Sequence, residues 1–296
     1  MLTNITAPIV AAKPYIGRFA PSPTGPLHMG SLLSAVASYI DSKANNGTWL
    51  LRIEDIDPPR EIKGSSKAII ASLEAHQLYW DGDILWQHDQ YDYYRDCLAA
   101  LTAKHLLYAC NCSRVKGIYC GHCRDRNTPP PLPFSLRLKT TAIDVDFIDA
   151  IQGSYQQNIS QQIGDFILWR KDGLPAYQLA VVADDEYQNI THIIRGSDLL
   201  ESTPRQIYLA NALQFNLTEY GHLPVLVNNE GQKLSKQTNA SPIDDNSPMD
   251  NIYHVLQKLG QALPAEKPSS VTELLGWAID NWDINAIPKQ MSVQQS

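Results

Sequence analysis

A proline- and glycine-rich turn, RFAPSPTGPLHMGS at residues 18–31, joins a strand-like segment to a helical one. Residues 15–20, which lead into the turn, and residues 48–53, which follow the helical segment, have sequences typical of strands. Between them, apolar residues recur at helical spacing: Leu32, Leu33, Val36, Ala37 and Ile40. A helix that begins after such a turn presents free backbone N–H groups and the positive end of its dipole to an anion. The β-turn-α-β unit therefore predicts a nucleotide-phosphate site, with Thr24 and His28 as further donors.

The turn by itself leaves a structural role open. Pro21 and Pro23 can stiffen a loop, and a histidine at a helix start can simply cap the helix. A second motif, Lys-Leu-Ser-Lys at residues 233–236, follows more than two hundred residues later. Alone, the turn could be a stiffened loop and residues 233–236 a solvated basic segment. Together, the two motifs favour nucleotide binding.

The two motifs together resemble those of a known enzyme class. PSPTGPLHMGS resembles the HIGH signature, and KLSK the KMSKS signature, of class I aminoacyl-tRNA synthetases. LRIEDID at residues 51–57 and ITHIIRGSDLLESTPRQIYL at residues 190–209 resemble the glutamyl branch of that class. The match runs from Tyr15 to Lys236, three quarters of the chain, with the motifs in the expected order. The resemblance implies an α/β fold with a Rossmann-like parallel sheet, an inserted α+β zinc-binding subdomain and a short helical C-terminal region.

Two positions depart from the signatures. Ser31 stands where HIGH has its second histidine, and Gln237 stands where KMSKS has its last serine. The backbone N–H groups and the helix dipole at the turn do not depend on Ser31. The charge of the second motif lies on its lysines, so Gln237 matters little.

Composition narrows the function classes. A hydrophobic fraction of 44% and a charged fraction of 19% are those of an ordinary globular protein, and 296 residues suffice for one large or two modest domains. The net charge of −7 argues against an indiscriminate nucleic-acid binder and favours a selective RNA substrate, or none. No long apolar run or signal peptide is evident, so we expect a soluble cytoplasmic protein with no membrane contact.

The expected organisation has four parts. Residues 1–107 form the first Rossmann-like half, with helices over 61–78 and 89–107. Residues 108–170 form the inserted zinc-binding subdomain, with strands in 134–149 and 166–170 after a proline-rich stretch. Residues 171–238 form the second half and carry the KLSK loop. Residues 239–296 form a short helical region, with helices over 250–259 and 271–282. Only 60 residues follow Lys236, whereas glutamyl-tRNA synthetases normally carry a much longer anticodon-binding region there, so we expect none.

The resemblance assigns roles to particular residues. In-line attack of a carboxylate on the α-phosphate of ATP needs positioning and charge neutralisation, with Mg²⁺ bridging phosphate oxygens. The expected catalytic residues are His28, Lys233 and Lys236. The expected ATP contacts are Thr24, His28, Gly30, Ser31 and Lys236. The expected L-glutamate contacts are Arg18, Phe19, Ala20, Pro21, Ser22, Glu54, Tyr177 and Arg195. Without the resemblance, the charges of Arg52, Glu54, Asp55 and Arg60 would be interpreted as surface ion pairs.

Four of the five cysteines are clustered as C-x-C and C-x-x-C: Cys110, Cys112, Cys120 and Cys123. In a cytoplasmic protein this pattern favours a tetrahedral Zn²⁺ over disulfides. Queuosine-modifying relatives of glutamyl-tRNA synthetase resemble this stretch with two cysteines, a tyrosine and a final cysteine, which implies Cys110, Cys112, Tyr119 and Cys123 as ligands. Cys120 stays open as the alternative fourth ligand. The site is expected to be structural, and Cys97 is expected to be a small buried residue.

The favoured interpretation is a shortened, queuosine-modifying relative of glutamyl-tRNA synthetase. The resemblance implies ATP-dependent, tRNA-independent formation of glutamyl-adenylate and transfer of glutamate to queuosine in the anticodon loop of tRNA(Asp). L-glutamate, ATP and that anticodon stem-loop are the implied partners, and no obligate protein partner is implied. One alternative is a minimal glutamyl-tRNA synthetase that charges a tRNA 3′ end. The other is a non-catalytic paralogue, against which the intact site residues argue.

Overall fold

The first half of the chain contains the predicted β-turn-α-β unit. The computed structural model describes residues 14–112, 118–119, 121–228, 230–233 and 241–295. β1 (Ile16–Phe19) pairs in parallel with β2 (Thr48–Ile53), and α1 (Met29–Ala44) connects them. β2 in turn pairs in parallel with β3 (Leu85–Trp86).

Two helices differ from the expected bounds. Between β2 and β3 lie η1 (Pro58–Arg60) and α2 (Ser65–Ala75), so the helix expected over 61–78 starts later. Gly64 precedes α2 with a φ of +86°, a left-handed conformation in which a helix does not continue. After η2 (Gln87–Gln90), α3 (Tyr91–Ala103) ends before residue 107, which instead begins a strand.

The second half supplies the rest of the parallel sheet. It contains α5 (Tyr177–Tyr187), β9 (His192–Gly196), η3 (Ser197–Ser202), α6 (Thr203–Leu213) and β10 (Glu219–Leu223). β10 pairs in parallel with β9 and with β6 (Asp144–Asp149). β9 lies beside β1, because the Thr191 N–H donates to the Ile16 carbonyl at 2.9 Å and the Ile16 N–H donates to Thr191 Oγ1 at 2.8 Å. The two halves thus form one α/β layer, as expected for a class I synthetase fold.

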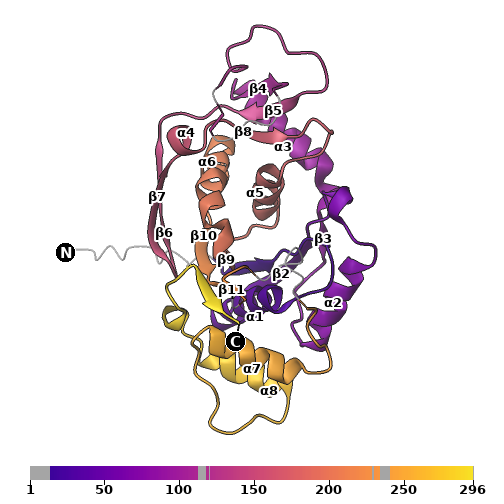
Figure 1. The fold of residues 1–296 in the computed structure, drawn as a ribbon, viewed down its shortest axis with the longest axis vertical. Coiled ribbons are helices and arrows are strands. Elements are labelled where there is room, and N and C mark those ends of the chain that lie inside the picture. The colour runs from indigo at the N-terminus through magenta and orange to yellow at the C-terminus, as the bar shows by residue number, and fades with distance from the viewer. Residues whose placement is uncertain (1–13, 113–117, 120, 229, 234–240, 296) are drawn as a thin grey trace, which may run out of the picture.

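The region between the halves contributes strands to two sheets. β4 (Leu107–Cys110), β5 (Ser135–Leu138) and β8 (Phe166–Trp169) form an antiparallel sheet at one end of the molecule (Figure 1). β6 forms a hairpin with β7 (Gly153–Asn158), and through β10 this hairpin extends the parallel sheet; α4 (Ile159–Gln162) follows it. The expected strands therefore exist, and the four-part division of the chain stays a prediction.

The C-terminal segment packs on the first half. α7 (Pro248–Lys258) and α8 (Val271–Asp280) lie beside α1 at the opposite end from β4, β5 and β8 (Figure 1). Their buried residues Ile252, Leu256 and Leu274 belong to the same core as α1. After η5 (Ile284–Ala286), β12 (Ser292–Gln294) pairs in parallel with β11 (Val225–Val227). Within the described residues, no helix has the length and apolarity needed to cross a membrane.

Candidate active site and metal centre

One cavity of about 810 Å³ lies where β1, β2 and β9 end. Carboxyl ends of parallel strands are where open α/β sheets bind ligands. All the residues expected to be catalytic or to contact glutamate or ATP line this cavity, apart from Lys236, which lies outside the described residues. They are Arg18, Phe19, Ala20, Pro21, Ser22, Thr24, His28, Gly30, Ser31, Glu54, Tyr177, Arg195 and Lys233. Residues up to 215 positions apart in the sequence thus meet at one site.

His28 is the N-cap residue of α1 and lines the cavity. Its Nδ1 accepts a hydrogen bond from the Ser31 N–H at 3.2 Å, so the neutral ring carries its proton on Nε2. That Nε2 lies 3.1 Å from Ser31 Oγ. The serine that replaces the second histidine of the motif therefore contacts the first, and it orients the ring at the helix start.

A buried ionic network supports the floor of the cavity. Arg18 Nε donates to Asp185 Oδ1 at 3.1 Å, and Arg52 Nη2 donates to the same oxygen at 2.8 Å. Burial would raise the pKa of Asp185, but Arg18 and Arg52 hold it below its ordinary value. Arg52 is fully buried, so its interpretation as a surface ion pair is wrong. The sequence analysis missed Asp185; its signal is the run of acids that directly follows the apolar residues 179–183 in helix α5.

Glu54 follows β2 and extends into the same network. Its Oε1 lies 3.7 Å from Arg52 Nε. Burial raises the pKa of the Glu54 carboxyl to about 7, against the opposing effect of Arg52 and Arg18. A carboxyl in a cavity whose pKa lies near neutral pH is typical of a functional site, because it can gain or lose its charge when a ligand binds. Its burial also excludes the surface ion pair suggested by the residues alone.

Arg195 is the second arginine of the cavity, and it differs from Arg18 in its partners. The side chain is buried, with 5% of the residue exposed. Within the described part of the chain, its guanidinium donates to three neutral side chains and its Nη1 has no hydrogen-bond partner. A buried charge without a counter-ion is costly unless a ligand supplies one. Arg195 is therefore suited to bind an anionic group.

Lys233 lies at the rim of the cavity. Its Nζ is 2.5 Å from Asp198 Oδ2, and Asp198, on η3, also lines the cavity. Sequence analysis did not identify Asp198 as a contact of the basic motif. Segment 241–243 crosses the turn nearby, with the Ile243 N–H donating to the Leu27 carbonyl at 3.0 Å.

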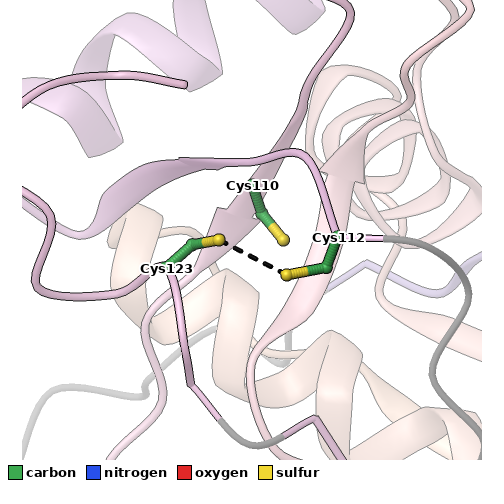
Figure 2. Close-up of side chains that lie close together, drawn as sticks. All are labelled: Cys110, Cys112 and Cys123. Atoms are coloured by element: carbon green, nitrogen blue, oxygen red, sulfur yellow. Dashed lines mark hydrogen bonds between the residues drawn. The ribbon is translucent and has the colours of Figure 1, made fainter. Parts of the chain in front are cut away.

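Three of the clustered cysteines face one another at the end of β4 (Figure 2). The sulfur atoms of Cys110, Cys112 and Cys123 lie within 4.8 Å of one another, and those of Cys112 and Cys123 are 3.4 Å apart. Tyr119 Oη lies 3.3 Å from the Cys110 sulfur and 3.8 Å from that of Cys112. Cys120 lies outside the described residues. Cys97 is buried in α3 and outside this group, as expected.

This donor set fits a zinc ion. Three thiols converge with a phenol oxygen beside them, and structural Zn²⁺ sites take four ligands, of which at least two are thiolates in the common sets. Burial raises the pKa of the Cys110 thiol, but hydrogen bonds with Tyr119 and the Cys112 backbone lower it to about 7. A thiolate is the form that binds metal.

The parallel sheet, the capped turn and the cavity define a class I tRNA synthetase catalytic domain. Residues 16–116 and 124–256 match the family described as tRNA synthetases class I (E and Q), catalytic domain. The chain belongs to this family.

The names of similar curated relatives point to a narrower group within this family. A curated protein from Neisseria gonorrhoeae, named Glutamyl-Q tRNA(Asp) synthetase, is 47% identical over 93% of this chain and 98% of its own length. A protein of the same name from Pseudomonas fluorescens is 43% identical over 95% of this chain and 96% of its own length. Among solved structures, a glutamate tRNA ligase from Elizabethkingia meningosepticum in complex with its amino acid has a TM-score of 0.80 and 25% identity. It covers 96% of this chain, which spans 67% of that protein.

Proposed function

We propose that this protein is a ligase that activates L-glutamate with ATP, without requiring tRNA, and transfers the glutamyl group to queuosine in the anticodon loop of tRNA(Asp). The observation that carries the proposal is the nearly full-length similarity to curated proteins named Glutamyl-Q tRNA(Asp) synthetase. Membership of the class I synthetases implies use of ATP, and the family implies glutamate and tRNA as substrates.

The proposed glutamate site uses the charges around the cavity. Two arginines, Arg18 and Arg195, take the carboxylates, since a guanidinium group supplies both a positive charge and N–H donors to a carboxylate. Glu54 takes the substrate ammonium. The remaining contacts come from Tyr177 and from the four residues that follow Arg18: Phe19, Ala20, Pro21 and Ser22.

The proposed ATP site lies at the start of α1. Thr24, His28, Gly30 and Ser31 line the phosphate side, and the lysines of the second motif, Lys233 and Lys236, neutralise the leaving pyrophosphate. A Mg²⁺ ion bound together with ATP would supply further positive charge at the phosphates. An oxygen of the glutamate α-carboxylate forms a bond to the α-phosphorus as the bond to pyrophosphate breaks. A nucleophilic group of queuosine then attacks the glutamyl carbonyl, and AMP leaves.

The RNA partner follows from this second step. For queuosine to reach the adenylate, the anticodon stem-loop of tRNA(Asp) itself enters the cavity that holds the adenylate. A minimal glutamyl-tRNA synthetase is the alternative, but the curated relatives that match this chain over nearly their whole length carry the glutamyl-Q name. A cytoplasmic location remains a prediction.

The proposed metal centre is a structural Zn²⁺ held by Cys110, Cys112 and Cys123. The fourth ligand is Tyr119, whose oxygen lies among the sulfur atoms, with Cys120 as the alternative. Bound there, the ion would tie the end of β4 to the segment around Cys123.

Activation without RNA is tested by ATP–pyrophosphate exchange with the purified protein. We expect exchange that depends on glutamate and not on glutamine, in the absence of any tRNA. Exchange that appears only after tRNA is added would contradict tRNA-independent activation. No exchange under any condition would support the non-catalytic paralogue.

The pKa of Glu54 predicts how activation depends on pH. Glu54 must be ionised to hold the substrate ammonium, and its pKa is raised to about 7, so the carboxylate form is lost as pH falls through this value. We expect kcat/KM for glutamate to fall about tenfold per pH unit below 7 and to level off above it. Glu54→Gln should abolish this pH dependence and lower kcat/KM at every pH. If the Glu54→Gln variant keeps the fall in kcat/KM below pH 7 and the His28→Gln variant loses it, the titrating group is His28 instead.

A further inference from the structure

Arg195 is held by groups on the strands beside it. Along the sheet, β6, β10 and β9 are neighbours, and His222 on β10 is directly opposite Arg195 on β9. His222 Nε2 lies 3.1 Å from Arg195 Nε, the donor. Arg195 Nη2 donates to Thr203 Oγ1 at 2.8 Å and to Gln206 Oε1 at 2.7 Å. With Nε and Nη2 engaged, Nη1 is the donor left for a ligand in the cavity.

Asp149, the last residue of β6, holds the other side of the His222 ring. Its Oδ2 lies 2.5 Å from His222 Nδ1. Its Oδ1 accepts backbone hydrogen bonds from Ile151, Gln152 and His222 at 2.8 to 3.0 Å. Burial alone would raise the pKa of Asp149, but the His222 ring and these N–H groups lower it. Asp149 is therefore a carboxylate, and the hydrogen between it and His222 belongs to Nδ1.

This assignment determines what His222 presents to Arg195. Burial and the positive charge of Arg195 lower the pKa of the fully buried His222 ring, which favours its neutral form. A neutral ring that carries its proton on Nδ1 has a lone pair on Nε2. That lone pair faces an arginine N–H, which can only donate. The opposite tautomer, or a charged ring, would place two N–H groups against each other.

We propose that Asp149 and His222 are positioning residues for substrate binding: Asp149 fixes the tautomer of His222, and His222 orients the Arg195 guanidinium toward the glutamate carboxylate. The proposal rests on the proposed function, because it needs glutamate as the ligand of Arg195. Asp149 and His222 do not line the cavity and so act through Arg195.

Asp149→Asn tests the tautomer without changing the shape of the side chain. The asparagine oxygen can still accept the three backbone hydrogen bonds, while its amide group donates to Nδ1 and moves the ring proton to Nε2. We expect KM for glutamate to rise about tenfold or more, with KM for ATP unchanged within about twofold. His222→Phe, which removes the acceptor, should match this effect. His222→Gln can place its amide oxygen where Nε2 lies in the wild type, so this variant should recover part of the affinity.

His76→Gln is the matched control. His76 is also fully buried, but it contacts the Ser72 carbonyl and Asn251, away from the cavity. This variant should lose stability and keep the wild-type KM for glutamate. The ring proton itself is read by NMR of ¹⁵N-histidine protein, which should show His222 protonated on Nδ1 in the wild type and on Nε2 in Asp149→Asn.

The outcomes separate this inference from the proposed function. Wild-type protein without glutamate-dependent exchange would contradict the proposed function, whatever the tautomer. Wild-type exchange with an unchanged KM for glutamate in Asp149→Asn and His222→Phe would overturn the positioning role. So would a wild-type His222 that carries its proton on Nε2, a measurement that requires no variant to fold.

Discussion

Replacing Arg195 by glutamine lowers kcat/KM for glutamate by about a thousandfold, while KM for ATP stays within about threefold. The reason is the cost of leaving the substrate carboxylate buried without its positive partner, about 4 kcal/mol. Glutamine retains a hydrogen-bond donor, so the loss reports the positive charge of the guanidinium. Steady-state ATP–pyrophosphate exchange, with glutamate and ATP varied in turn, measures both constants.

Arg95→Gln provides the comparison for Arg195→Gln. Arg95 is an exposed arginine of α3 that pairs with Asp92, one turn away on the same helix. Its loss should leave both KM values unchanged, since exposed pairs of this kind contribute little. Equal glutamate kinetics in Arg195→Gln and wild type would show that the carboxylate binds elsewhere.

The second large effect is expected at the cysteine cluster. Cys112→Ala should lose the zinc, from about one ion per chain to less than about 0.1 after dialysis, because a structural site with a missing ligand binds far more weakly. The melting temperature should fall as well, since the binding free energy of the metal contributes to folding. Metal content by mass spectrometry and thermal unfolding give the two readouts.

Single variants separate the ligands from their neighbours. Cys97→Ala removes a buried cysteine outside the cluster and should keep the zinc. Tyr119→Phe and Cys120→Ser decide the fourth ligand, because only the variant that removes a ligand weakens zinc binding. Wild-type protein that contains no zinc, and takes up none when refolded with it, would refute the metal centre.

Local sequence signals were sufficient for the first β-turn-α-β unit. The period of the apolar residues after the turn is helical, and the flanking segments are strand-like, so β1, α1 and β2 could be located before the structure was known. The helices α7 and α8 were identified for the same reason. By contrast, β12 has the sequence Ser-Val-Gln, with one apolar residue, and exists because β11 offers it an edge to pair with.

The buried acids that position the side chains of the site could not be identified from the sequence. Asp185 contacts Arg18 across 167 positions, and Asp149 contacts His222 across 73. No local pattern relates such residues, because their pairing depends on the order of strands in the sheet. The resemblance located residues that line the cavity, whereas the buried acids that hold the arginines required the three-dimensional arrangement.

The identity of the acceptor is the central claim, and one transfer assay tests it directly. The protein is incubated with labelled glutamate, ATP and tRNA(Asp) that lacks its 3′-terminal adenosine, with and without queuosine at the wobble position. We predict label on the queuosine-containing tRNA alone. Transfer that requires the 3′ adenosine and ignores queuosine would contradict the account and identify an enzyme that charges the tRNA 3′ end.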